Sequence, residues 1–119
     1  MLEYFLPKTQ LEILQDTDAE EGRYFQIKLQ EITNTINTMP KTHETDGQGD
    51  RSISYLHYFH ACGGTWITEK DIHIDPDQAF GYINIGIGGE LGYISIKERI
   101  HIGFELDLYC TPTAIKAIK

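Results

Sequence analysis

The sequence predicts an α+β fold, an antiparallel β-meander of about five strands with one or two N-terminal helices. Three observations predict it. Apolar residues recur at helical spacing in the N-terminal third, whereas the second half alternates bulky apolar and polar residues over short runs. Glycine-rich and proline-containing turns separate those runs, as in consecutive hairpins. The length of 119 residues fits a single domain, 1–119, since domains commonly have about 100–150 residues.

The N-terminal third contains the predicted helices. Residues 6–15 form a short helix with Pro7 in its first turn, where a missing N–H costs nothing. An acidic stretch that ends in Gly22 then breaks this helix. Residues 23–39 fit two interpretations, because the first of them alternate like a strand, whereas Leu29 and its successors recur at helical spacing. A strand running into a helix and a helix throughout both stay open.

The rest of the chain is predicted to contain one loop, five strands and a final helical turn at residues 113–119. Residues 40–52 hold almost no apolar side chain and two glycines, which indicates an exposed loop. The expected strands cover residues 53–60, 65–72, 80–87, 91–96 and 100–108. The last strand is predicted from the unbroken alternation of its apolar residues: Ile100, Ile102, Phe104, Leu106 and Leu108.

The chain is strongly acidic, with eighteen Asp plus Glu residues against ten Lys plus Arg and a net charge of −8. Residues 1–50 hold ten acids and four bases, a net charge of −6, and residues 51–119 hold eight acids and six bases, a net charge of −2. Because affinity for phosphate comes from clustered Lys and Arg, this balance predicts no direct nucleic-acid binding. It favours a basic protein partner, such as a nucleic-acid-handling enzyme. Solubility alone is the simpler interpretation of the same charge.

The sequence also indicates the cellular compartment of the protein. No run of about eighteen apolar residues is present, so we expect no membrane span. Glu3 stands where a secretory signal would carry positive charge, and the apolar stretch around it is too short for one. The two cysteines, Cys62 and Cys110, fit a reducing environment. These observations predict a cytoplasmic protein.

Two sets of carboxylates are candidate binding surfaces. Residues two apart on a strand point the same way, so Glu69 with Asp71 and Glu105 with Asp107 each form a pair on a predicted strand. Two such pairs facing each other could bind a divalent metal or perform acid–base chemistry. The alternative for these pairs is a solvated outer face of the sheet. The first set lies in the acidic N-terminal half: Asp16, Asp18, Glu20, Glu21, Glu44, Asp46 and Asp50. The second set comprises Glu69, Asp71, Glu105 and Asp107.

One cluster has the side chains of a metal site. The motif His57-x-x-His60-x-Cys62 combines imidazole and thiolate, which are ordinary zinc ligands, and Cys110 at the end of the last strand could approach it. The spacing matches no zinc-finger pattern. A zinc bound there is expected to be structural rather than catalytic. In the alternative, His57 packs in the core and Cys62 is a small turn residue. A cysteine nucleophile finds no support, because a Cys–His pair is defined in space rather than by adjacency in the chain.

Three segments of the second half carry a resemblance to a known family. They are Trp66-Ile67-Thr68-Glu69-Lys70-Asp71, Phe80-Gly81-Tyr82 and Glu90-Leu91-Gly92-Tyr93-Ile94-Ser95. With them the chain resembles a set of small proteins of unknown function encoded on bacterial plasmids, integrative elements and phages. Residues 26–50 depart from that family's pattern. The resemblance implies a mobile-element origin and a β-meander with a leading helix, and it carries no established activity.

Charge and resemblance together favour a binding protein over an enzyme. We expect an accessory protein of a mobile element that inhibits a host nucleic-acid-handling defence enzyme, such as a CRISPR effector or a restriction enzyme, in the cytoplasm of a host bacterial cell. The acidic side chains would occupy Lys and Arg sites meant for phosphate. The alternative functions are a zinc-binding structural domain or a small metal-dependent hydrolase. A third is a regulatory module that dimerises through an exposed strand edge.

Overall fold

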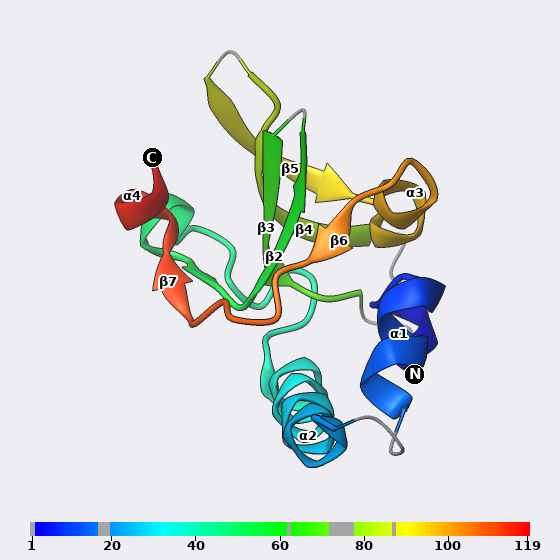
Figure 1. Cartoon of the computed structure of the whole chain (residues 1–119). Helices are drawn as coiled ribbons and strands as arrows, with labels where there is room; N and C mark the ends of the chain where they lie inside the picture. The colour runs from blue at the N-terminus through cyan, green and yellow to red at the C-terminus, as the bar shows by residue number, and fades with distance from the viewer. Residues whose placement is uncertain (1, 17–19, 62, 72–77, 87) are drawn as a thin grey trace.

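The computed structural model describes residues 2–16, 20–61, 63–71, 78–86 and 88–119. Helices from the N-terminal part of the chain pack against a five-stranded antiparallel sheet built by the second half (Figure 1). The predicted α+β fold class is therefore confirmed. Within these described ranges, no helix is both long and apolar enough to cross a membrane.

The described elements of the N-terminal part of the chain are all helices. They are η1 Leu2–Tyr4, α1 Lys8–Gln15 and α2 Gly22–Thr38. Of the two interpretations of residues 23–39, the continuous helix is the correct one. Its Thr and Asn residues do not break α2, because threonine hydroxyls donate to carbonyls four residues earlier, Thr33 to Leu29 at 2.7 Å and Thr38 to Asn34 at 2.8 Å.

The described strands form a five-stranded sheet and a separate two-stranded pair. Their bounds are β1 Ile53–Ser54, β2 Leu56–His60, β3 Gly63–Glu69, β4 Ala79–Asn84, β5 Gly89–Ile94, β6 Glu105–Leu106 and β7 Thr113–Ala114. The main sheet has the order β5-β4-β3-β2-β6, and β1 pairs with β7. Strands β2 to β5 make the predicted meander, and β6 returns to the free side of β2. The chain ends in α4 Ile115–Ile118, within the predicted helical turn.

The predicted strand over residues 100–108 is wrong in its first half. The chain there forms α3 Ile96–His101, and Ser95 caps this helix by accepting a hydrogen bond from the Glu98 N–H at 3.1 Å. Gly103, with φ of 108°, then turns the chain into β6. The apolar alternation misled because it continues across a helix end, a turn and a two-residue strand. Phe104 and Leu106 are buried, whereas Ile102 at the turn is 53% exposed.

The core lies between the helices and one face of the sheet. On β2, Leu56 and Tyr58 point inward, and the Tyr58 hydroxyl donates to the carbonyl oxygen of Phe5. The side chain of Gln10 in α1 bonds both backbone groups of Leu106, at 3.0 and 2.9 Å, and so covers the edge of β6. The alternate residues of these strands project from the opposite, outer face of the sheet.

Residues 40–52 are not a uniformly exposed loop. Thr42, Thr45 and Ser52 are buried, although most of their neighbours are exposed. The segment contains the short helix η2 Gly49–Arg51, and the Thr42 N–H donates to the carbonyl oxygen of Lys70 at 2.8 Å. Thr42 and Thr45 can be buried here because Lys70 and Glu69 accept the hydrogen bonds of their hydroxyls.

Candidate functional site

A row of aromatic rings crosses the outer face of the sheet. The register places His57 of β2 opposite Trp66 of β3, and Trp66 opposite Tyr82 of β4. The rings of His57 and Trp66 stack with centroids 4.5 Å apart and planes 3° apart, and Tyr82 packs on Trp66 at 5.7 Å. Gly64 lies beneath this stack, since a Cβ there would come within 2.5 Å of the indole ring. Cross-strand pairing thus fixes both ring planes.

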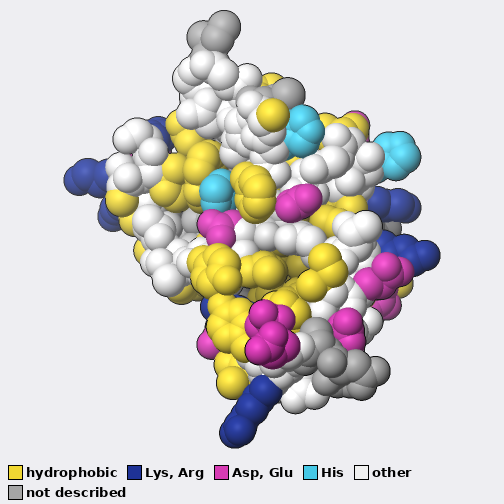
Figure 2. All heavy atoms as spheres, viewed as in Figure 1, with side chains coloured by type: hydrophobic (Ala, Val, Ile, Leu, Met, Phe, Trp, Pro, Cys, Tyr) yellow, Lys and Arg dark blue, Asp and Glu magenta, His cyan; other side chains and the backbone are white. Residues whose placement is uncertain are grey.

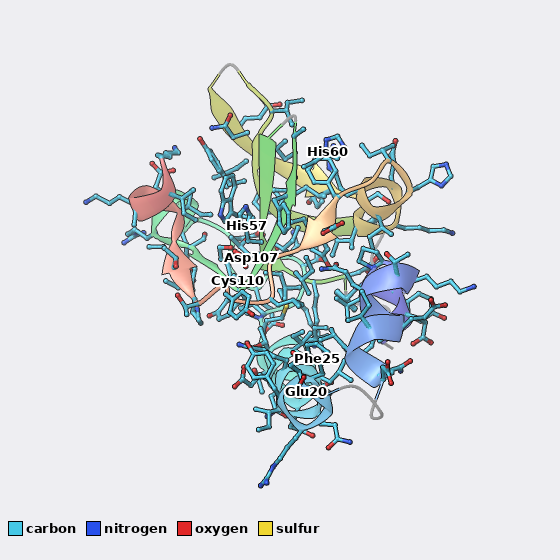
Figure 3. All side chains as sticks on the ribbon, viewed as in Figure 1. Glu20, Phe25, His57, His60, Asp107 and Cys110 are labelled. Carbon is cyan, nitrogen blue, oxygen red and sulfur yellow. The ribbon has the colours of Figure 1, made fainter. Side chains whose placement is uncertain are left out.

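Asp107 holds His57 in this row. Asp107 follows β6, which is paired with β2, and its backbone N–H donates to the His57 carbonyl oxygen at 2.8 Å. Its Oδ2 lies 3.3 Å from His57 Nδ1, and its Oδ1 accepts the N–H of Tyr109 at 2.9 Å. Figure 3 shows His57, Asp107 and Cys110 beside one another. The carboxylate therefore fixes the imidazole and, at the same time, the turn that follows β6.

A pocket of about 210 Å³ opens between the outer face and the C-terminal segment. Its walls include Ser54, His57, Trp66, Asp107, Cys110 and Thr113. Strand β7 and α4 form the far wall, because Thr113 and Ile118 also line it. A carboxylate, an imidazole, hydroxyls and an aromatic plane therefore meet in one small polar site.

Cys110 does not have the surroundings of a reactive nucleophile. Its Sγ donates to the Tyr55 carbonyl oxygen at 3.7 Å. Burial is the main cause that raises the pKa of Cys110, and the negative charge of Asp107 also raises it. Because the thiolate is the reactive form, a raised pKa leaves Cys110 unreactive near neutral pH.

The residues proposed as zinc ligands do not gather. His57 and His60 are three apart on β2 and point to opposite faces, and His60 stacks on Phe104 with ring centroids 5.1 Å apart. Cys62 lies outside the described residues. Among those that are described, no three His, Cys, Asp or Glu side chains come together in a way that could hold a metal ion. The structure brings Cys110 near His57 and Asp107 and leaves His60 apart.

The second acidic set separates into buried and exposed members. Glu69 is 2% exposed and Asp71 is 9% exposed, so neither belongs to a solvated face. Glu69 accepts the N–H groups of His43 at 2.8 Å and of Thr45 at 2.7 Å, together with the Thr45 hydroxyl. Strands β3 and β6 flank β2 on opposite sides, so the two predicted pairs do not face each other. Glu69 stabilises the fold by holding residues 43–45, whereas Asp107 lines the pocket.

The first acidic set is exposed but divided. Asp18 lies outside the described residues, and the other six are exposed: Asp16, Glu20, Glu21, Glu44, Asp46 and Asp50. Asp50 in η2 pairs with Lys119 at 2.6 Å, and η2 lies beside α4, away from the start of α2 (Figure 1). Glu20 and Glu21 directly precede α2. These acids therefore do not form one continuous surface.

An exposed patch on α2 was missed by the sequence analysis. It consists of Tyr24, Ile27 and Tyr109, which are 41%, 52% and 70% exposed, and we call it the α2–Tyr109 patch. A side-chain hydrogen bond to Tyr109 is the main cause that raises the pKa of Tyr24 to about 12. Lys28 Nζ lies 4.9 Å from the Tyr109 ring centroid and 5.8 Å from that of Tyr24. Tyr24 and Ile27 lie outside the core-facing stripe of α2, and apolar residues at such positions are the sequence signal that could have revealed the patch.

Comparison with known proteins adds no relative. No protein-family model matches the chain, and neither the curated proteins nor the solved structures contain a match. The function has to be inferred from the geometry and charge of these surfaces.

Proposed function

We propose that the protein inhibits a basic host nucleic-acid-handling defence enzyme, such as a CRISPR effector or a restriction enzyme, by binding to it on behalf of a mobile element. The α2–Tyr109 patch, bordered by carboxylates, is the observation that carries this proposal. Figure 2 shows hydrophobic side chains gathered on the lower half of one face, with Asp and Glu side chains directly beside them.

The patch has the chemistry of an interface centre. Tyrosine is enriched among the residues that dominate binding energy, because it offers a large rigid ring with a polar end. The Tyr24 and Tyr109 side chains interact with each other, and Lys28 Nζ lies 5.8 Å and 4.9 Å from their ring centroids, so the three side chains already form one group without a partner. Ordering in advance lowers the conformational entropy lost on binding.

The carboxylates around the patch favour a basic partner. Glu20 and Glu21 are exposed where α2 begins, and exposed Glu31 lies one helical turn from Lys28, with Oε2 3.2 Å from its Nζ. Charges at the rim of an interface speed association and select the partner more than they add affinity. The inhibitor would act by occupying Lys and Arg side chains that otherwise hold phosphate.

Inhibition of purified enzymes tests this function. We expect the protein to block nucleic-acid cleavage by at least one purified CRISPR effector or restriction enzyme, and to block it less well as salt is raised. Replacing a tyrosine of the patch, Tyr24→Ala or Tyr109→Ala, should weaken inhibition about tenfold or more, as removal of an interface hot spot does.

The chain offers a matched control for this test. Tyr4 lies in η1 and is 43% exposed, close to the 41% of Tyr24, so Tyr4→Ala removes the same ring from another surface. Equal inhibition by Tyr4→Ala and Tyr24→Ala would remove the patch from the proposal. Inhibition that is identical at low and high salt would exclude the electrostatic mechanism.

A further inference from the structure

We infer that the pocket between the outer face of the sheet and the C-terminal segment binds a guanidinium group, the head group of an arginine side chain. The inference deepens the proposed function and rests on it for the source of that arginine, the basic partner. His57, Trp66 and Asp107 form the inner wall of the pocket, and Thr113 of β7 stands across from them.

The charge of the pocket favours a cation. Asp107 supplies a carboxylate to the pocket, and none of the described residues that line it is Lys or Arg. The whole chain has a net charge of −8. A positive group entering the pocket therefore meets one carboxylate and no cation among the described residues of its walls. Lys28 lies outside these walls, with its Nζ 4.9 Å from the ring centroid of Tyr109, which lines the pocket.

Asp107 has acceptor capacity left for that cation. Its Oδ1 accepts one N–H, from Tyr109 at 2.9 Å, and the 3.3 Å between Oδ2 and His57 Nδ1 exceeds the roughly 2.7–2.9 Å of a charge-assisted bond. A carboxylate offers about four lone-pair sites, so both oxygens can accept further donors. The hydroxyls of Ser54 and Thr113 donate to carbonyl oxygens, at 3.3 and 2.8 Å, which leaves their own lone pairs for a ligand.

Guanidinium matches this arrangement better than ammonium does. It presents five N–H donors in a planar fork that pairs with a carboxylate through two bonds and lies flat against aromatic rings. The pocket supplies the carboxylate, additional oxygen acceptors and the aromatic surface of His57 and Trp66, whose rings stack on each other. Lysine would bring a compact point charge without the fork.

The size of the pocket limits the ligand to one such group. Sites for drug-sized molecules have volumes of about 300–1,000 Å³. The pocket measures about 210 Å³, which suits the end of a single side chain. An arginine reaching in from a bound protein would fill it without a separate small molecule.

Tryptophan fluorescence can test the pocket directly, because Trp66 is the one tryptophan of the chain. The full-length protein is titrated with N-acetyl-arginine amide, N-acetyl-lysine amide and the uncharged isostere N-acetyl-citrulline amide. We expect a saturable change for arginine, with at least about tenfold weaker responses for lysine and citrulline, since hydrogen bonds to charged groups contribute about 1.5–3 kcal/mol.

Two variants test whether the change in fluorescence comes from arginine bound in this pocket. Asp107→Asn keeps an acceptor for Tyr109 and removes the charge, and it should weaken arginine binding about tenfold or more. Glu105→Gln, two residues away on β6, removes an exposed carboxylate that does not line the pocket, and it should bind arginine as the original chain does. The three-ligand comparison on the unaltered chain needs no variant, so a folding defect in Asp107→Asn cannot obscure the result.

The outcomes separate this inference from the proposed function. Equal responses to arginine and citrulline, equal responses to arginine and lysine, or unchanged arginine binding in Asp107→Asn would each overturn the guanidinium pocket. Enzyme inhibition that persists after such a result would leave the proposed function standing. Selective arginine binding with no enzyme inhibited would support the guanidinium pocket and contradict the proposed function.

Discussion

Glu69 and Asp107 belong to the same predicted set of strand carboxylates, and the structure gives them opposite surroundings. Glu69, at the end of β3, is 2% exposed and receives two backbone N–H groups and a hydroxyl from residues 43–45. The side chain of Asp107, after β6, is 33% exposed, contacts one imidazole and opens onto a pocket. A carboxylate whose acceptor sites are filled by its own chain is structural, whereas one with sites left is available to a ligand.

The loop that Glu69 holds explains why its sites are filled. His43 has φ of 75°, a left-handed conformation that side chains other than glycine rarely adopt. The N–H groups of His43 and Thr45 then point at the same carboxylate. Glu69 thus stabilises a backbone conformation that costs free energy by itself.

Removing Glu69 should have the largest effect on stability. Glu69→Ala leaves two backbone N–H groups and the Thr45 hydroxyl without their acceptor, and each buried donor left unpaired costs about 1–3 kcal/mol. We expect the free energy of unfolding to fall by about 3 kcal/mol, measured by urea denaturation.

A matched control is available on the edge strand β6. Glu105→Ala removes an exposed carboxylate and should change the free energy of unfolding by less than about 0.5 kcal/mol. If Glu69→Ala cost no more than Glu105→Ala, the contrast between the buried and the exposed carboxylate would be wrong.

The contrast also shows what could be predicted from the sequence. Periodicity identified the first N-terminal helix and the meander, because those signals are local, and it left residues 23–39 open between a strand running into a helix and a continuous helix. It placed Glu69 and Asp107 within strands, whereas they lie at the end of β3 and directly after β6. The burial of Glu69 depends on residues 43–45, and the surroundings of Asp107 depend on His57, 50 positions away in the chain. No local pattern contains those contacts.

The misassigned strand had a local signal that alternation outweighed. Ser95-Ile96-Lys97-Glu98 has the spacing of a capping box, and Ser95 does cap α3. The site differs, because the pairing of His57 with Asp107 joins residues 50 positions apart through the return of β6 to β2. Only the strand order of the folded chain places them together.

Removing Asp107 should have a smaller effect on stability. The contact between Asp107 and His57 is partly exposed, and exposed pairs of this kind contribute about 0–1 kcal/mol, while the bond from the Tyr109 N–H adds a comparable amount. We expect Asp107→Ala to lower the free energy of unfolding by about 1 kcal/mol in the same urea experiment. A loss as large as that of Glu69→Ala would make Asp107 a structural anchor too and would weaken the case for a ligand site.

The smallest expected effect is on the titration of Cys110. Burial is the main cause that raises the pKa of this thiol, and the charge of Asp107 is a smaller one. Folding therefore favours the neutral form of Cys110. The resulting stability is fully present below the ordinary thiol pKa of about 9 and is lost as the pH rises through the higher pKa of the folded protein. Alkylation rates against pH in a Cys62→Ser background would measure the pKa of Cys110. We expect Asp107→Asn to lower it modestly and Glu69→Gln to leave it unchanged. A shift of equal size in both variants would mean that the Cys110 thiol reports general loosening of the fold rather than the charge inside the pocket.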